Sequence, residues 1–386
     1  MTGPSVAIVG GGALGLSTAW HLLRLGVRAV TVVEAGPSGG DSTSLSVGVI
    51  ETQYLEPLQI ELRARSMKFF RTLERDRGLE IVRTGYLRLA HDDALLPEFE
   101  RSVEIQRSLG IADVRILDRG DIEALVPDMR CDDLRAGLWG PSDGYIDPHR
   151  YTTILAAMIR EEGGKILTQS RMTDVTRAPS DGFRLDTTAG EVACDVVVNA
   201  AGAWAGKVGT MLGTEVPVLP QRHQAAVVHV PRPLDYPMPM VMDYIPHSGG
   251  LGLYFRPEAQ DKLIAGLHTE DPLHGLVDPD GYRRAVDPSF LEQVAAKIAD
   301  RLPGLGDCGL AHGWAGLYPM SPDGAQIVGP AADDSRVFVV AGGGGSGLQA
   351  SPALGLVAAE WIANGASRSV PGGERLRPGR EIHAPA

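Results

Sequence analysis

Two short apolar runs near the start of the chain enclose a helical stripe of apolar residues. The runs cover 5–9 and 30–33, and continuous apolar runs of this length are typical of strands buried on both faces. The stripe between them follows the spacing of one helix face, at Leu16, Ala19, Trp20 and Leu23. We therefore predict a strand, a helix that ends before Gly26, and a second strand.

The same apolar signature returns later in the chain. Runs at 195–199 and 337–341 also predict buried strands, and a helix-like stretch at 348–361 follows the second. Further helix-like stretches lie at 56–76, 92–109, 148–163 and 288–301. By contrast, 216–285 has short extended runs broken by proline and glycine, a pattern that favours antiparallel strands. The pattern as a whole predicts an α/β protein, α+β overall.

Composition narrows the class of protein. The 386 residues suit two domains, or one domain with another embedded in it. A net charge of −12 disfavours nucleic acid and anionic membranes as partners. Three widely separated cysteines indicate neither a metal site nor a disulfide framework. We find no signal peptide and no apolar run long enough to span a membrane, so we expect a cytoplasmic protein.

A glycine turn joins the first strand to the first helix. Gly10, Gly12 and Gly15 form the pattern GxGxxG, and Glu34 ends the next strand about 20 residues on. In this arrangement the glycines allow a tight turn, close approach to a pyrophosphate and close helix packing, while the acid accepts hydrogen bonds from ribose. The motif predicts dinucleotide binding but leaves FAD and NAD both open.

Two later segments favour FAD. The strand at 195–199 runs into the small residues Ala200 to Ala203, where backbone can lie against a flat ligand, although a plain strand-to-helix turn would look similar. The strand at 337–341 runs into Gly342–Gly347 and then a helix, which creates an anion site at the helix N-terminus. Such a terminus suits the N1–C2=O edge of a reduced flavin, with a purely structural glycine loop as the alternative.

These motifs occur in the order found in the D-amino-acid oxidase superfamily of FAD enzymes, which the chain resembles along nearly its whole length. Within it, the chain is similar to monomeric sarcosine oxidase and to the flavin-bearing β subunits of sarcosine oxidase and proline dehydrogenase. The matching segments are GGGALG with Glu34, DSTS at 41–44, GYIDP at 144–148, NAAGAW at 199–204, RHQ at 222–224, GLYFRP at 252–257, GLYPMSPDGAQIVG at 316–329 and GGGGSGLQASP at 342–352.

The resemblance implies a Rossmann-type FAD-binding domain interleaved with an antiparallel-sheet substrate domain. We expect the FAD domain at 1–85, 145–215 and 311–386, and the substrate domain at 86–144 and 216–310. The expected FAD-binding residues are Gly10, Gly12, Ala13, Leu14, Gly15, Glu34, Ala35, Ser42, Thr43, Ser44, Val175, Ala201, Gly202, Trp204, Gly343, Gly344, Gly345, Ser346, Gly347, Leu348 and Gln349. The family's flavin-tethering cysteine falls at Gly316, and the serine-rich turn holds no histidine, so we expect noncovalent FAD.

Family members oxidise a C–N bond by hydride transfer to flavin N5, giving an imine that can hydrolyse. The resemblance therefore implies an amine or amino-acid substrate, of the N-alkyl or cyclic imino acid type. It assigns the substrate pocket to Tyr254, Tyr318 and His268. Further candidates for the pocket are Arg256, His223, Gln349, Tyr244 and Gln53.

Three family cations are missing, which sets this chain apart. The lysine linked to oxygen activation falls at Ile264, and a carboxylate-binding lysine falls at Gln349. A carboxylate-binding arginine has no counterpart in 47–53. A buried carboxylate needs a cation, so Arg256, His223 or Arg222 would have to supply one, or the substrate is not a simple N-methyl amino acid. Without a lysine at 264 we expect O2 to be a poor oxidant and the enzyme to behave as a dehydrogenase, although the sequence leaves both O2 and another electron acceptor open.

Other functions remain open on the sequence alone. The same superfamily contains 2-hydroxyacid dehydrogenases, which oxidise a C–O bond. The β-subunit resemblance also allows a flavin-bearing subunit of a hetero-oligomeric amine dehydrogenase, or another oligomer. A flavin monooxygenase fits the GLYFRP and GLYPMSPDG segments less well.

Overall fold

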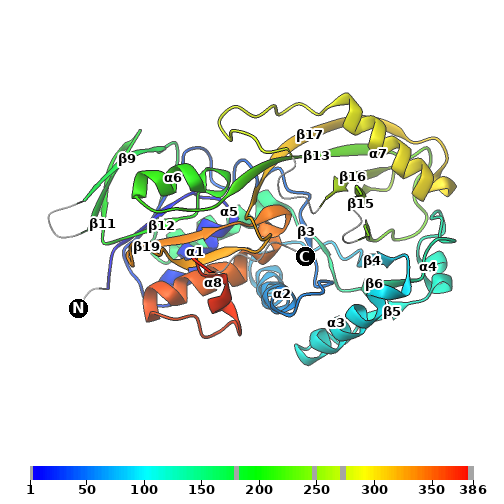
Figure 1. Cartoon of the computed structure of the whole chain (residues 1–386), viewed down its shortest axis with the longest axis horizontal. Helices are drawn as coiled ribbons and strands as arrows, with labels where there is room; N and C mark the ends of the chain where they lie inside the picture. The colour runs from blue at the N-terminus through cyan, green and yellow to red at the C-terminus, as the bar shows by residue number, and fades with distance from the viewer. Residues whose placement is uncertain (1–2, 178–181, 246–249, 270–274, 381–386) are drawn as a thin grey trace.

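The computed structural model describes residues 3–177, 182–245, 250–269 and 275–380. Six strands form its first sheet in the order β18-β19-β12-β1-β2-β8. These strands are β1 Val6–Val9, β2 Val30–Val33, β8 Lys165–Leu167, β12 Val196–Asn199, β18 Ile327–Pro330 and β19 Val337–Ala341. All neighbouring pairs are parallel except β18 with β19. The four buried strands predicted from apolar runs are confirmed, and they lie side by side (Figure 1).

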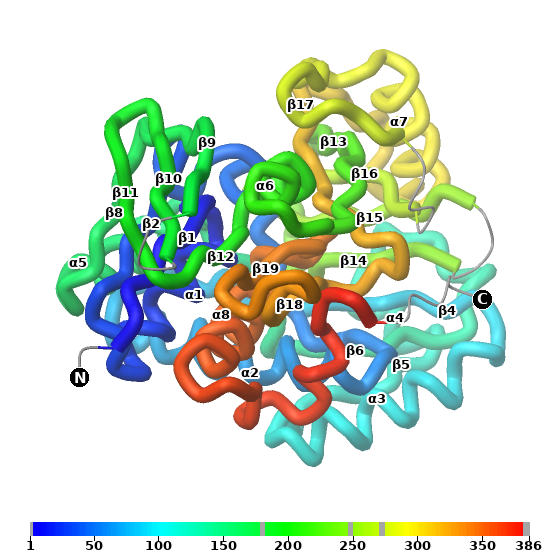
Figure 2. Tube along the Cα trace, turned by 60° about the vertical axis from the view of Figure 1, so that its left-hand side comes forward, coloured from blue at the N-terminus to red at the C-terminus, as the bar shows by residue number. Residues whose placement is uncertain are grey.

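Helices cover one face of this sheet. They are α1 Ala13–Arg24, α2 Pro57–Arg77, α5 Pro148–Glu161 and α8 Gly347–Asn364. Their apolar side chains share one core with alternate residues of β1, β2, β12 and β19. Figure 2 shows α2 and α8 side by side, although they are far apart in the sequence. This contact brings the middle of α2 close to the glycine loop that precedes α8.

The other face of the six-stranded sheet carries a small antiparallel sheet and one helix. The sheet has the order β11-β10-β9, and its strands are β9 Met172–Arg177, β10 Phe183–Thr187 and β11 Gly190–Cys194. The helix is α6 Ala205–Leu212. The result is a layered unit in which both faces of the parallel strands are buried, as their apolar sequences require.

Eight strands form the second large sheet, in the order β17-β13-β16-β15-β14-β4-β6-β5. They are β4 Tyr86–Ala90, β5 Arg115–Leu117, β6 Ala136–Gly140, β13 Leu219–His229, β14 Met240–Asp243, β15 Gly252–Ala259, β16 Lys262–His268 and β17 Gly309–Met320. All pairs are antiparallel except β4 with β14. This sheet lies beside the first one in Figure 1.

Three helices accompany the second sheet, and they are α3 Leu96–Ser108, α4 Arg119–Leu125 and α7 Pro288–Arg301. α4 and α7 pack on one face through Ile122, Phe290, Val294 and Ile298. The opposite face carries Tyr254, Ile264 and Ala225, which contact Val47 and neighbouring apolar residues instead. This second face borders the site described below.

The mixed α/β fold class is confirmed, with local differences. The stretch predicted as one helix at 92–109 begins as the 3-10 turn η1 Asp93–Leu95 before α3. The short helices α4 and α6 were not predicted, because each is too brief to show a helical repeat. The remaining elements are β3 Val49–Ile50, β7 Gly144–Tyr145, η2 Gly202–Trp204, η3 Pro303–Leu305, η4 Gly344–Ser346 and η5 Gly373–Leu376.

The domain ranges stay a prediction. β17 begins at Gly309 and crosses the expected limit between 310 and 311, and residues 1–2 and 381–386 of the expected FAD domain lie outside the described residues. Within the described part of the chain, no helix is both long and apolar enough to cross a membrane.

Candidate active site

A cavity of about 890 Å³, including open solvent at its mouth, lies where the two large sheets meet. The glycine turn after β1, the glycine loop before α8, the segment 42–47, and strands β13 and β17 all contribute to its wall. Segments predicted to return to one cofactor therefore do meet in one place. The described lining residues include no Asp, Glu, Lys or Arg.

Glycine is required at two positions of the first turn for steric reasons. Gly10 has φ +112°, and a Cβ there would lie 2.3 Å from the carbonyl oxygen of Ala200. A Cβ at Gly15 would lie 1.9 Å from the carbonyl oxygen of Gly10. Both obstacles are backbone atoms, so neither can move aside cheaply. These glycines keep β1, β12 and α1 in close contact and leave the N-terminus of α1 accessible.

Glu34 holds the turn from the neighbouring strand. Its carboxylate accepts hydrogen bonds from the amide of Gly11 at 2.6 Å and from the amide of Gly36 at 2.7 Å. A carboxylate has about four acceptor sites, so capacity for ribose hydroxyls is left. At the start of α1, the amide of Ala13 donates to Thr43 Oγ1 at 3.1 Å. Thr43 and Leu14 both line the cavity, as expected for residues beside a pyrophosphate.

The glycine loop before α8 is shaped by the ring of Tyr318. A Cβ at Gly345 would lie 2.5 Å from that ring, and Gly344 has φ +49°. The loop turns through η4 into α8, whose first turn carries no acidic residue. Gly343, Gly344, Gly345, Gly347 and Leu348 all line the cavity. The helix N-terminus, with its partial positive charge, therefore belongs to the cavity wall.

Aromatic side chains form the opposite part of the wall. Tyr254 from β15 and Tyr318 from β17 interact through their hydroxyl groups, and His223 from β13 stacks on Tyr318 with ring centroids 3.8 Å apart. Burial raises the pKa of Tyr318 to about 12 and that of Tyr254 well above its ordinary value. Both phenols are therefore protonated and able to donate hydrogen bonds at neutral pH. Gly266 makes room for Tyr254, since a Cβ there would lie 2.3 Å from the phenol.

Five expected pocket residues lie outside this lining, namely His268, Tyr244, Arg256, Gln53 and Gln349. His268 stands on the same face of the sheet as Tyr254, and its ring makes an edge contact with Tyr244 at 4.7 Å between centroids. Arg256 lies over the ring of Tyr145 at 4.0 Å, and it donates to the carbonyl of Val47 and to Glu258. The guanidinium of Arg256 thus already has protein partners.

Gln53 and Gln349 belong to a buried polar network behind the cavity. The side chain of Gln53 donates to Asp143 at 2.8 Å, and burial raises the pKa of Asp143 to about 8. The Oε1 atom of Gln349 accepts from the amide of Glu51 at 3.1 Å. Its Nε2 atom donates to the hydroxyl of Tyr54 at 3.1 Å. Burial also raises the pKa of Glu51.

Glu51, Tyr54 and Arg63 also belong to this network, and none of them was predicted from the sequence. Arg63 is 1% exposed and donates to Ser346 Oγ at 2.7 Å, directly before α8. A signal for Arg63 existed, because it interrupts the apolar stripe formed by Ile60, Met67 and Phe70 on α2. A cation in such a stripe indicates a buried charge with a specific role.

The remaining expected cofactor residues divide into two groups. Ser42 and Gly202 line the cavity, and Ser44 lies in the same turn, where it donates to the carbonyl of Asp41. The others are outside the lining: Ala35 is exposed, Ala201 and Val175 pack beneath the sheet, and Trp204 donates to Asp280.

The residues present fit an FAD molecule. The two glycine segments line the cavity with backbone alone, two helix N-termini meet the cavity, and an acid follows β2. Gly316 lines the cavity where a family cysteine would stand, and none of the three cysteines lines it. These observations support noncovalent binding, which stays a prediction.

We expect FAD to leave the protein when it is denatured in acid. No cysteine or histidine stands at the family's tethering positions, so unfolding should release the flavin into the supernatant. The measurement is flavin absorbance in supernatant and pellet after acid precipitation. Yellow colour retained in a washed pellet would contradict noncovalent binding.

Comparison with known proteins gives a consistent family match. The family model described as FAD dependent oxidoreductase matches residues 5–361. Mitochondrial dimethylglycine dehydrogenase of Mus musculus is 29% identical over 374 residues, covering 93% of this chain and 42% of that protein. Glycine oxidase of Geobacillus kaustophilus is 26% identical over 366 residues, covering 92% of both proteins.

The fold of a solved structure matches the fold of this chain over 97% of its residues. L-proline dehydrogenase from P. horikoshii aligns with a TM-score of 0.84 at 26% identity, covering 97% of both chains. The chain spans about two fifths of the length of the dimethylglycine dehydrogenase that it matches.

Proposed function

Because this chain belongs to the family of FAD-dependent oxidoreductases, we propose that it oxidises the C–N bond of a secondary amine or amino acid. The observation that carries the proposal is the cavity lining, whose described residues provide aromatic rings and glycine backbone but no carboxylate, lysine or arginine. Hydride transfer needs a substrate that is held and shielded from water, and it needs no acid–base triad. Bound FAD supplies the acceptor, N5 of its ring, for a hydride from the carbon next to nitrogen.

The names of the relatives support the choice of a C–N bond. Glycine oxidase, dimethylglycine dehydrogenase and L-proline dehydrogenase are all named for small amino acids or N-alkylated amines. We propose an N-alkyl amino acid or a cyclic imino acid for this chain, with an imine as the first product and its hydrolysis in water as the following step.

Each wall residue has a defined task in this proposal. Tyr254 and Tyr318 are protonated at neutral pH, and because one hydroxyl donates to the other, the pair keeps one O–H that can donate to the substrate. Their rings can also exclude water from one face of the substrate. Among the described lining residues, His223 is the one whose side chain can carry a positive charge, so it is our candidate for pairing with a substrate carboxylate. Ile264 packs among apolar residues of the same sheet face, which supports an electron acceptor other than O2.

The test is anaerobic reduction of the flavin by a panel of amines, amino acids and 2-hydroxyacids. We expect rapid bleaching by at least one secondary amine. Tyr254→Phe and Tyr318→Phe should each slow reduction about tenfold, because one hydrogen bond contributes about 0.5–1.5 kcal/mol and about 1.4 kcal/mol is a factor of ten in rate. Tyr282→Phe, outside the cavity lining, is the matched control and should leave the rate unchanged.

Two results would contradict the proposal. Bleaching by hydroxyacids but by no amine would assign the chain to C–O oxidation. Wild-type rates of flavin reduction in both Tyr254→Phe and Tyr318→Phe would show that these hydroxyl groups do not contribute to substrate oxidation. Comparing the isolated chain with protein purified from its native host also shows whether turnover requires a further subunit.

A further inference from the structure

The buried side chain of Arg63 lies where α2 meets the glycine loop before α8. Its Nη1 donates to Gln59 Oε1 at 2.5 Å, and its Nη2 donates to Ser346 Oγ at 2.7 Å. Its guanidinium also covers the ring of Tyr54 at 4.2 Å. All three contacts are to neutral groups, so they orient the charge without neutralising it.

The charge of Arg63 is not compensated by a direct ion pair. Within the described part of the chain, the side-chain contacts of Arg63 are to Gln59, Ser346 and Tyr54 and include no carboxylate, and its Nε has no hydrogen-bond partner. Glu51 interacts electrostatically with Arg88 and, more weakly, with Arg63, and burial raises the pKa of Glu51. An arginine that is 1% exposed normally has an anionic partner, because a buried unpaired charge is costly.

A second positive feature lies beside the first. Ser346 is the N-cap residue of α8, which runs for 18 residues from Gly347, and its first turn holds no acidic side chain. A helix of this length has a partial positive charge at its N-terminus. Two positive features this close destabilise each other unless an anion is present. The cavity adjoins the same loop through Gly345 and Gly347.

We propose that Arg63 is a positioning residue that holds Ser346 and provides positive charge for an anion at the N-terminus of α8, namely the pyrimidine edge of reduced FAD. This inference rests on the proposed placement of the flavin ring at the glycine loop. Positive charge there stabilises the reduced, negatively charged ring more than the oxidised, neutral one. Arg63 therefore raises the reduction potential of the bound FAD.

The test measures the flavin and not turnover. In an Arg63→Met variant with FAD bound, we expect the two-electron equilibrium against a reference dye to shift at least tenfold toward oxidised flavin, which corresponds to about 30 mV. Sulfite, which adds to oxidised flavin and leaves negative charge on the ring, should bind at least tenfold more weakly. Arg63→Lys, which keeps a charge but loses the paired donors, should recover part of both losses.

Arg65→Met is the matched control on the same helix. Arg65 pairs with Glu61 and its side chain is 37% exposed, so its removal should leave the potential and sulfite affinity unchanged. FAD content and melting temperature show whether each variant is folded. If Arg63→Met does not fold, the potential and sulfite affinity of Arg63→Lys, compared with wild type, test the inference. Wild-type potential and sulfite affinity in a folded, FAD-loaded Arg63 variant would overturn the inference. Failure of the proposed C–N oxidation would appear in the substrate panel and would leave these flavin measurements intact.

Discussion

A Gly15→Val variant is expected to be recovered without bound FAD and with a markedly lower melting temperature. A Cβ at position 15 would lie 1.9 Å from the carbonyl oxygen of Gly10 and 3.3 Å from the Cβ of Ala200. Because the first obstacle is backbone, α1 would have to move away from β1 and β12. That movement destroys the turn that approaches the pyrophosphate, and overpacking alone costs about 1–3 kcal/mol.

The measurement for this variant is the ratio of flavin to protein absorbance after purification, together with a thermal melt. Gly281→Ala is the control, since a Cβ at Gly281 has no neighbour within 4 Å. We expect Gly281→Ala to retain full FAD content. A Gly15→Val protein with wild-type flavin content and melting temperature would show that the turn is not the binding element.

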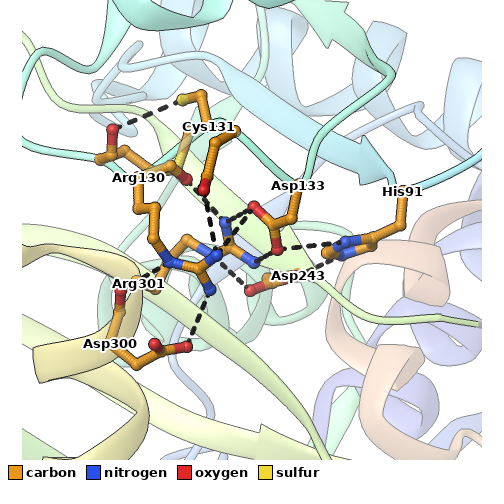
Figure 3. A network of polar contacts seen from close by, with 9 residues as sticks. His91, Arg130, Cys131, Asp133, Asp243, Asp300 and Arg301 are labelled. Carbon is orange, nitrogen blue, oxygen red and sulfur yellow. Dashed lines mark hydrogen bonds and ion pairs between the residues drawn. The ribbon is translucent and has the colours of Figure 1, made fainter.

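Replacing Arg301 with methionine is expected to reduce the free energy of unfolding by about 3–5 kcal/mol, the cost typical of breaking a buried ion pair. The side chain of Arg301 is 5% exposed, and it donates twice to Asp133 at 2.8 Å and once to Asp243 at 2.7 Å (Figure 3). It thereby ties α7 to β14 and to the segment before β6. Removing it leaves two carboxylates without their main cation.

The pH dependence of this effect follows from the pKa of Asp133. Arg301 holds that pKa at about 2, below the ordinary value of about 3.9. A lowered carboxylate pKa contributes stability that is fully present above pH 4 and is lost as the pH falls toward 2. The difference in melting temperature between wild type and Arg301→Met should therefore be large at pH 7 and shrink in acid.

The control for the ion pair is Arg119→Met, which removes an exposed pair with Glu123 at 3.8 Å. Exposed pairs contribute about 0–1 kcal/mol, so little change is expected. If Arg301→Met lowers the free energy of unfolding at pH 7 no more than Arg119→Met does, the ion pairs of Arg301 with Asp133 and Asp243 do not stabilise the fold.

The parallel sheet could be predicted because each of its central strands is recognisable from its own short run of apolar residues. The apolar runs at β1, β2, β12 and β19 and the glycines at both turns need no knowledge of their neighbours. The family resemblance and the FAD cofactor that these motifs indicated are confirmed by the family match over residues 5–361. The order of the eight-stranded sheet could not be predicted in this way, because it depends on pairings between strands that are remote in sequence, such as β4 with β14.

The same distinction separates the predicted from the missed site residues. Tyr254 and Tyr318 lie in recognisable segments, and both line the cavity. The role of Arg63 could not be predicted, because it depends on a contact with Ser346, which is far away in the sequence. Sequence alone also could not place His268, whose neighbour is Tyr244 and not the cavity lining.

The position of β12 and β19 in the sheet has a consequence for biosynthesis. β1 pairs with β2 within the first forty residues, but its other edge pairs with β12, and β12 pairs in turn with β19 at Val337. Until ribosomes have made both late strands, one edge of β1 keeps its backbone N–H and C=O groups unpaired, and the apolar side chains on its faces lack part of their native cover. Such long-range pairing slows folding and prolongs exposure to aggregation. The turn after β1 and the loop after β19, which both line the cavity, therefore reach their native positions only after nearly the whole chain has been made.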